Sequence, residues 1–269
     1  MAAALGSGPA VTHQLDGGRI GVMKDLLVIT PSRARPQRLR EMLNACLALS
    51  GPTTDIAVGY DDDDADGYKK LAIDYADHRQ VRWFCGPRTG LAGWTNRLAW
   101  HYTRRRLPGA PLNRDEDAER YLAFASLGDD HLPRTRGWDR LLLEAIDRMG
   151  GTGIVYGDDL FMRQNLPTAP VISADIVQAL GWMCEPSLRH MYVDNVWRDI
   201  GRGAGCLAYV PDVVIEHVHF RAGKAAADQV YAESEAGTDA DRAAYGRWRA
   251  ERMADDVARV RALREAGLC

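Results

Sequence analysis

The chain has 269 residues, of which 46% are hydrophobic and 26% are charged, so it can bury a catalytic-size core and does not have the composition of a disordered protein. Its formal net charge of -3 excludes a general attraction to polyanions. No apolar run is long enough to span a membrane, so no membrane partner is expected.

Residues 1–22 are rich in glycine and alanine without periodicity, and the first clear strand pattern follows Met23. We expect this segment to be a poorly ordered leader or cloning remnant outside the fold. It lacks the basic-then-apolar pattern of a secretory signal, which favours a cytoplasmic protein. The five cysteines are odd in number and form no C-x-x-C pair, so they predict reduced thiols rather than a zinc site.

Short apolar runs alternate with helical patterns in the first part of the chain. Residues 26–30 predict a buried strand that ends at Pro31, and residues 36–49 predict a helix with a proline in its first turn. The same alternation continues with strands at 56–60 and 81–84 and helices at about 68–76 and through Trp100. This order predicts an α/β fold with a mostly parallel, Rossmann-like sheet flanked by helices.

The second part of the chain begins with a near-continuous apolar run at 121–127, which predicts a central strand. Helices are expected near 138–149 and 174–180, strands at 153–156 and 207–210, and an extended segment at 213–219. Residues 240–266 mix apolar and charged residues as an amphipathic helix does. We therefore expect a catalytic domain at 23–220 and a helical extension at 221–269 that packs on it.

Polar residues follow each predicted strand. Because ligands of open parallel sheets bind outside the carboxyl ends of the strands, these residues are the candidates for a binding site. They are Thr30 to Arg35, Asp61 to Asp64, Gly86 to Arg88, Asp129 with Asp130, and Asp158 with Asp159. Arginines beside several carboxylates indicate an anionic ligand that is bound partly through a metal, and a nucleoside diphosphate has this chemistry.

Asp129 and Asp130 follow the most apolar strand of the chain. Carboxylates on a rigid sheet edge suit Mg²⁺ or Mn²⁺ that bridges a diphosphate, although an aspartate pair can also form a turn or cap a helix. His217 and His219 alternate on an extended segment and therefore project to the same face. One imidazole could complete the metal site, and a mixed oxygen and nitrogen ligand set favours Mn²⁺.

Five motifs in this order resemble the bacterial and phage glycosyltransferases of the GT-A type, family 2-like. They are ITPSRARP, VGYDDDD, FASLGDDHLP, YVDNVW and YVPDVVIEHVHF, within about residues 24–220. The resemblance implies a GT-A fold and a metal-dependent transfer of a sugar, with a hexose from a UDP-sugar favoured, to an acceptor hydroxyl. A phage-encoded protein of this kind would act in the host cytoplasm.

The metal motif departs from the pattern of that family. In the enzymes that the chain resembles, a D-x-D element binds the metal and the ribose or diphosphate of the donor. Here Gly128 stands at the place of the first carboxylate. The resemblance therefore leaves Asp130 as the direct metal ligand and gives Asp129 a supporting role behind the metal or on the ribose.

Other strand ends receive donor-binding roles. The candidates are Thr30, Pro31, Ser32, Arg33 and Arg35 around the nucleoside, Asp61 or Asp62 for the base, and Arg88 for the donor phosphates or sugar. Trp182 would stack on a sugar face or pack in the core. Asp194 is the candidate general base, which would make the enzyme inverting, but it would equally cap the helix that follows and leave the stereochemistry open.

Two other functions fit parts of the sequence. A nucleotidyltransferase would show a glycine-rich basic loop after its first strand, and ITPSRARP contains no glycine. A sugar- or nucleotide-binding module could keep the fold without the carboxylate expected at position 128. The acceptor is left open among a DNA base, a protein and a glycan, because the candidate acceptor segments, 103–119 and 221–240, have no readable motif. The basic run Arg104 to Arg106 with Arg134 and Arg136 could make a local phosphate-binding patch. No feature sets an oligomeric state.

Overall fold

The computed structural model describes residues 23–103 and 120–267, so the leader and the basic run Arg104 to Arg106 lie outside the described residues. Strand β1 (Met23–Ser32) shows how the sequence builds the layers. Leu26 and Val28 pack into the apolar cluster on one face of the sheet, and Leu27 and Ile29 pack into the cluster on the other face. All four are completely buried, which explains the unbroken apolar run.

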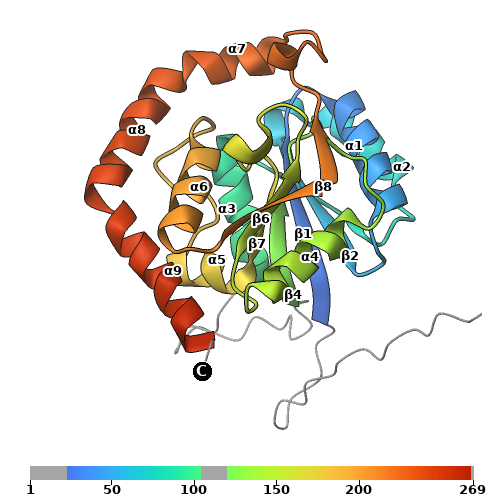
Figure 1. Ribbon diagram of the computed structural model, residues 1–269. Coiled ribbons are helices and arrows are strands. Elements are labelled where there is room, and N and C mark those ends of the chain that lie inside the picture. Colours follow the sequence, from blue (N-terminus) through green and yellow to red (C-terminus); the bar gives the residue numbers. More distant parts are fainter. Residues whose placement is uncertain (1–22, 104–119, 268–269) are drawn as a thin grey trace, which may run out of the picture.

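An eight-stranded curled sheet in the order β3-β2-β1-β4-β7-β6-β8-β5 forms the centre of the described part of the chain (Figure 1). Its other strands are β2 (Thr54–Asp61), β3 (Val81–Gly86), β4 (Arg120–Ser126), β5 (His131–Pro133), β6 (Ile154–Asp158), β7 (Pro170–Ser173) and β8 (Leu207–His217). The pairs β1–β2, β1–β4, β2–β3 and β6–β8 are parallel, whereas β7 and β5 run antiparallel to their neighbours. The predicted mostly parallel α/β sheet is confirmed.

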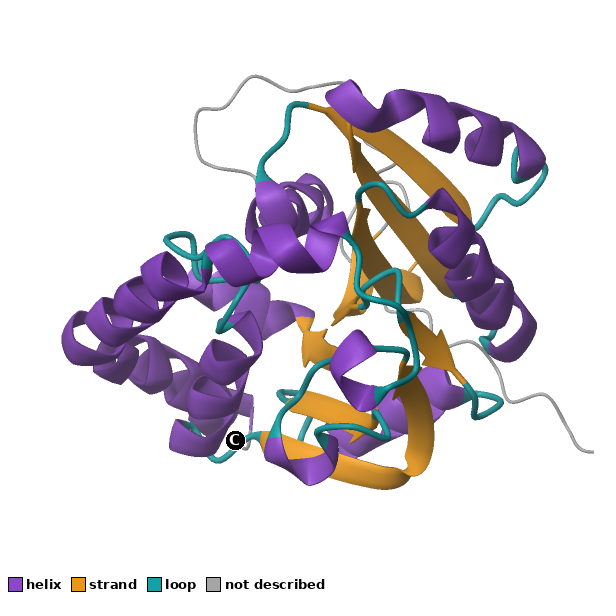
Figure 2. Cartoon of the chain, turned by 90° about the horizontal axis from the view of Figure 1, so that it is seen from above, coloured by secondary structure: helices purple, strands orange, loops and turns teal. Residues whose placement is uncertain are grey.

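Helices cover both faces of the sheet (Figure 2). One face carries α1 (Pro36–Leu49), α2 (Ala65–Asp74) and α4 (Trp138–Arg148), and the other carries α3 (Gly90–Thr103), α5 (Ala174–Leu180) and α6 (Val193–Gly203). None of the helices in the described part of the chain combines the length and the apolar composition that a bilayer-spanning helix needs.

The C-terminal residues form an arc of helices around one side of the molecule (Figure 1). They are α7 (Gln229–Ala236), α8 (Thr238–Glu251) and α9 (Met253–Gly267). Trp248 of α8 is 1% exposed and donates its indole N–H to Asp256, and α9 packs against α5 and α6. Asp241 of α8 accepts hydrogen bonds from three successive backbone N–H groups, those of residues 189–191. The division of the chain at residue 220 stays a prediction.

Two expectations about elements were wrong, and two short strands were missed. The single helix expected at 240–266 is two helices, and α7 precedes them. The segments expected at 207–210 and 213–219 belong to one strand, β8. The chain bulges at Pro211, which has no N–H for the ladder, and its pairing with β6 resumes at Val214. The short strands β5 and β7 were not expected.

Asp139 in the first turn of α4 ties this helix to the start of β2 and to the turn before it. Its Oδ2 atom accepts from the backbone N–H of Gly51 at 2.7 Å and from the hydroxyl of Thr54 at 2.6 Å, and it is 3% exposed. Asp139→Ala leaves these donors unpaired, so we expect the free energy of unfolding to fall by about 2 kcal/mol in chemical denaturation. Asp147→Ala, an exposed carboxylate on the same helix, is the matched control, and an equal loss in both variants would contradict the prediction.

Candidate functional site

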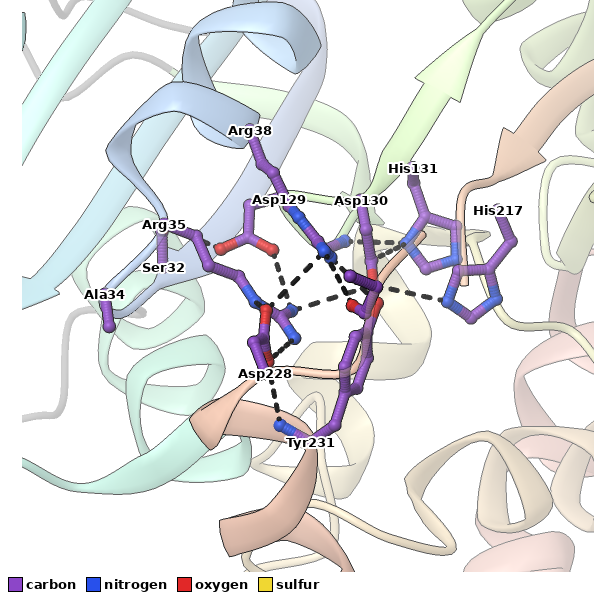
Figure 3. A network of polar contacts seen from close by, with 12 residues as sticks. Ser32, Ala34, Arg35, Arg38, Asp129, Asp130, His131, His217, Asp228 and Tyr231 are labelled. Atoms are coloured by element: carbon purple, nitrogen blue, oxygen red, sulfur yellow. Dashed lines mark hydrogen bonds and ion pairs between the residues drawn. The ribbon is translucent and has the colours of Figure 1, made fainter. Parts of the chain in front are cut away.

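The carboxyl ends of β1, β4, β6 and β8 bring the candidate residues to one edge of the sheet. The connection from β4 to β5 carries Asp129 and Asp130, and β5 pairs with the end of β8 so that His131 lies opposite His217. Their imidazole rings stack with centroids 4.1 Å apart. Two segments far apart in the sequence thus place a carboxylate and two imidazoles side by side (Figure 3).

Asp130, His131 and His217 form a candidate metal site. One ligand atom from each of them lies within 4.8 Å of the others. The Nε2 atom of His217 is 3.6 Å from Oδ2 of Asp130, and its Nδ1 atom faces Asp159 at 3.9 Å. A carboxylate behind an imidazole is a frequent arrangement at metal sites, because it orients the ring and fixes its tautomer.

Asp159 is itself held in place. Its Oδ1 atom accepts from the backbone N–H groups of Phe161 and Arg163, and its Oδ2 atom accepts from the hydroxyl of Thr168 at 2.8 Å. Burial opposes its ionisation, but His217 and these donors hold the pKa of Asp159 well below its usual range. A fixed negative charge therefore stands behind His217.

The electrostatics of the aspartate pair are unequal. Burial favours the neutral form of both, but contacts with His131 and His217 hold the pKa of Asp130 well below its usual range. Burial and the neighbouring charge of Asp130 raise the pKa of Asp129. For His217, burial lowers the pKa, whereas Asp130 and Asp159 outweigh burial and raise it to about 9. The negative charge of the pair therefore resides mainly on Asp130, beside the imidazoles.

The structure gives a steric reason for a glycine at position 128. A Cβ atom at this position would lie 2.8 Å from Oδ1 of Asp130 and 3.0 Å from Nδ1 of His131. Its backbone N–H also donates to that Nδ1 atom at 3.1 Å. Any side chain at 128 would therefore push against two of the candidate metal ligands, and the space of the missing carboxylate is taken by His131.

His219 lies next to the cluster but is not one of its three members. Its ring is 4.8 Å from that of His217, so the two histidines do come together as expected from their alternation. Its Nδ1 atom accepts from the backbone N–H of Arg221, and its ring stacks on Phe161 at 5.5 Å. Burial and the charge of His217 lower the pKa of His219 to about 4, so its imidazole is uncharged at neutral pH and lines the site.

Some of the candidate nucleoside contacts meet at Asp129. The hydroxyl of Ser32 donates to Oδ2 of Asp129 at 2.7 Å, and Nη1 of Arg35 lies 3.3 Å from its Oδ1. Thr30 is completely buried, with no hydrogen-bond partner for its hydroxyl among the described residues, and Pro31 is half-buried opposite Gly59 of β2. Ser32 and Arg35 are thus joined to Asp129, beside the metal cluster.

The loop after β2 forms a second group. Asp61 accepts from the indole N–H of Trp94 at 2.7 Å and from Arg33 at 2.9 Å, so both of its oxygens are engaged. Arg33 also pairs with Asp63. Asp62 is exposed, and among the described residues its side chain has no ion-pair or hydrogen-bond partner. The carboxylate of Asp61 is therefore held between the indole of Trp94 and the guanidinium of Arg33.

Arg88 and Trp182 make their contacts with residues other than the three of the cluster. Arg88 forms an exposed ion pair with Glu233 of α7. Trp182 is partly buried and lines a small cavity of about 50 Å³ with Trp100 and Gln178, between α3 and α5. This placement favours packing for Trp182 over stacking on a donor sugar.

Asp194 stands in the first turn of α6. Its Oδ1 atom accepts from the backbone N–H of Asn195 at 2.9 Å, which resembles the capping alternative. Burial raises its pKa to about 6, and the nearby His217 opposes this shift. A carboxyl group with such a pKa is mostly ionised at neutral pH and can accept a proton there, and the base role of Asp194 stays a prediction beside the capping role.

Sequence reasoning missed His131 and the residues that α7 contributes. The hydroxyl of Tyr231 donates to Oδ2 of Asp130 at 2.8 Å, and Asp228 makes two hydrogen bonds to Arg35 (Figure 3). His131 follows the aspartate pair directly, which is the one signal that could have found it. Nothing in the pattern of residues 221–240 indicates that they reach the strand ends.

No protein-family model matches the sequence, and no curated protein sequence matches it. Solved structures do match. S. aureus TarS 1-349 in complex with UDP has 10% identity and a TM-score of 0.53, over 71% of this chain and 60% of that chain. The mannosyltransferase PcManGT from Pyrobaculum calidifontis, in complex with GDP-Man and Mn²⁺, has 14% identity and a TM-score of 0.51, over 74% of this chain and 59% of that chain. The chain therefore has the GT-A fold and spans about three fifths of the length of these proteins.

Proposed function

We propose that the protein is a metal-dependent glycosyltransferase that moves a sugar from a nucleoside-diphosphate sugar to an acceptor hydroxyl. The observation that carries this proposal is the cluster of Asp130, His131 and His217 at the carboxyl edge of a GT-A sheet, next to Arg35. Metal ligands beside an arginine suit a diphosphate leaving group. The similar structures hold UDP, or GDP-Man with Mn²⁺, which supports a nucleotide-sugar donor.

The three residues of the cluster fit a divalent ion. Nε2 of His131 and Nδ1 of His217 are buried without a hydrogen-bond partner in the described part of the chain. A metal ion on the imidazoles, with Asp159 orienting the ring of His217, would explain both of these nitrogens. Two imidazoles and one carboxylate favour Mn²⁺ over Mg²⁺, which prefers oxygen ligands. When bound, the ion would offset the negative charge on the departing diphosphate.

The chain's own groups supply the rest of the reaction. Arg35 would add positive charge beside the phosphates, and Ser32 with Asp129 would hold the ribose hydroxyls. Asp194 would take the proton of the acceptor hydroxyl as it attacks, which gives inversion at the anomeric carbon. At neutral pH a carboxyl group with a pKa of about 6 is mostly ionised and can accept that proton. These roles are part of the proposal.

We further propose a UDP-sugar as the donor, a hexose as the transferred group and the cytoplasm as the location. The acceptor would be a DNA base, a protein or a glycan. A nucleotidyltransferase would consume a sugar phosphate with a nucleoside triphosphate, and a binding module would leave the nucleotide-sugar intact. Release of free nucleoside diphosphate from a nucleotide-sugar in the presence of Mn²⁺ separates these functions. Of the three, only the glycosyltransferase forms this product.

The test is a thermal-shift screen of nucleotide-sugars with and without Mn²⁺. A donor at a hundred times its Kd stabilises the folded chain by about 2.7 kcal/mol, so we expect Tm to rise by about 5 °C with the correct donor and Mn²⁺. UDP-sugars should give the largest shift, and GDP-mannose is the first comparison. Absence of a shift with every nucleotide-sugar, and of nucleotide release, would contradict the proposed function.

A further inference from the structure

The arginines next to the candidate metal site are occupied by the segment that begins α7. Nε and Nη2 of Arg35 donate to the two oxygens of Asp228 at 2.8 and 2.7 Å. Nη2 of Arg38 lies 3.6 Å from the same carboxylate, and its Nη1 atom donates to the hydroxyl of Tyr231 at 3.0 Å. A two-pronged contact of this kind is the one that guanidinium groups make with phosphates.

A second ion pair repeats this arrangement one turn further along α7. Arg88, on the loop between β3 and α3, pairs with the carboxylate of Glu233. The loops after β1 and β3 thus each present an arginine to an acid from α7. From Asp228 to Ala236 the chain has three acidic residues and no basic residue. The charge of this segment is therefore that of an anionic ligand.

Tyr231 closes the site toward the metal ligands. Its hydroxyl lies 2.8 Å from Oδ2 of Asp130, and the guanidinium carbon of Arg35 is 4.0 Å from its ring centroid. As a result Asp130 is 8% exposed, although it stands at an open strand end. The Oδ2 atom that accepts from Tyr231 is also the one that lies 3.6 Å from Nε2 of His217, so Tyr231 covers the side of Asp130 that faces this imidazole.

We propose that Arg35, Arg38 and Arg88 form a diphosphate-binding site, and that α7 fills it in the ligand-free protein with Asp228 and Glu233 in the places of phosphate groups. The assignment of that diphosphate to a nucleotide-sugar rests on the proposed function. Binding of the ligand frees Asp130 as it displaces α7. Opening of the helix and loading of the donor are therefore a single coupled event.

The packing of α7 agrees with a displaceable segment. Tyr231 is its one buried residue among the described ones, and a helix of eight residues has little stability of its own. Gly223, with φ of 70°, precedes the segment, and Gly237 follows it. Beyond Gly237, α8 stays anchored through Asp241 and Trp248. The chain can therefore release α7 without losing the rest of the arc.

The experiment uses inorganic pyrophosphate and UDP as probes on the full chain. Isothermal titration measures Kd, and hydrogen exchange measures protection of the amides of residues 229–236. We expect both probes to bind and to speed exchange in α7. Asp228→Asn and Glu233→Gln should each lower Kd, the first by about tenfold, since the competing carboxylate is gone. Asp239→Asn, an exposed acid of α8 that pairs with Arg242, is the matched control and should leave Kd unchanged.

Three results would overturn the inference: no binding of pyrophosphate, slower exchange of α7 upon binding, or weaker binding in Asp228→Asn. Glu233→Gln changes a solvent-exposed ion pair. It therefore tests the inference even if Asp228→Asn disturbs the fold. Pyrophosphate that releases α7 in a chain that neither binds nor cleaves nucleotide-sugars would leave this inference standing and remove the proposed function. Cleavage of a nucleotide-sugar with unchanged α7 exchange would do the opposite.

Discussion

Asp130→Ala is expected to lower metal-dependent release of nucleoside diphosphate by about a thousandfold or more, because it removes the anionic ligand that holds a charge-stabilising ion. His131 and His217 remain, but neutral imidazoles alone bind a hard divalent ion weakly. Turnover with and without added Mn²⁺ measures the loss. The fold should survive, because the backbone carbonyl of Asp130 still accepts from the N–H of Val218.

Asp66→Ala is the control for this variant, since Asp66 is a solvent-exposed acid on α2 that pairs with Lys69 of the same helix. Its activity and its Tm should match those of the unchanged protein. Circular dichroism of Asp130→Ala should show the same helix content as the control. If Mn²⁺ still stimulated turnover in Asp130→Ala to the original extent, the assignment of Asp130 as a metal ligand would be wrong.

Asp194→Asn is expected to slow sugar transfer by about a hundredfold to ten-thousandfold while donor affinity stays the same. The amide oxygen of asparagine can still accept from the N–H of residue 195, so the start of α6 is preserved. Initial rates of transfer and the Kd of the donor, measured in parallel, separate a base from a residue that merely caps the helix. Original transfer rates would remove Asp194 from the base role.

The pH dependence gives an independent check of the same residue. Burial raises the pKa of Asp194 to about 6, and the ionised form is the one that accepts a proton. Transfer by the unchanged enzyme should therefore rise with pH through about 6 and fall below it. In Asp194→Asn this acidic limb should disappear, since the amide does not titrate.

Local patterns were sufficient for the sheet's main strands and helices. β1 is buried on both faces and reads as one apolar run, and α1 repeats its buried residues at helical spacing. β5 has three residues and β7 has four, too few for a period to show. Their pairing depends on partners far away in the chain, so the antiparallel part of the sheet had no local signal.

Ser32, Arg35, Asp129 and Asp130 were predicted to lie together because ligands of parallel sheets bind at the carboxyl ends of the strands. The structure joins them by hydrogen bonds and ion pairs. That prediction depends on the parallel order of β1 and β4, which the sequence pattern predicts. Asp228, by contrast, is 193 residues from Arg35 along the chain. The path of α7 across the strand ends is set by tertiary packing, so no local pattern could reveal it.

The ligand set of Asp130, His131 and His217 has a consequence for metal selectivity in the cell. A site with two imidazoles follows the general affinity order of the first-row ions, in which Zn²⁺ and Cu²⁺ exceed Mn²⁺. The three ligands alone would not keep Zn²⁺ or Cu²⁺ out of the site, so the ion bound in the cell would depend on the free concentration of each metal. An enzyme built on this set would be sensitive to zinc excess, and preparations of it would carry whichever ion was most available during growth.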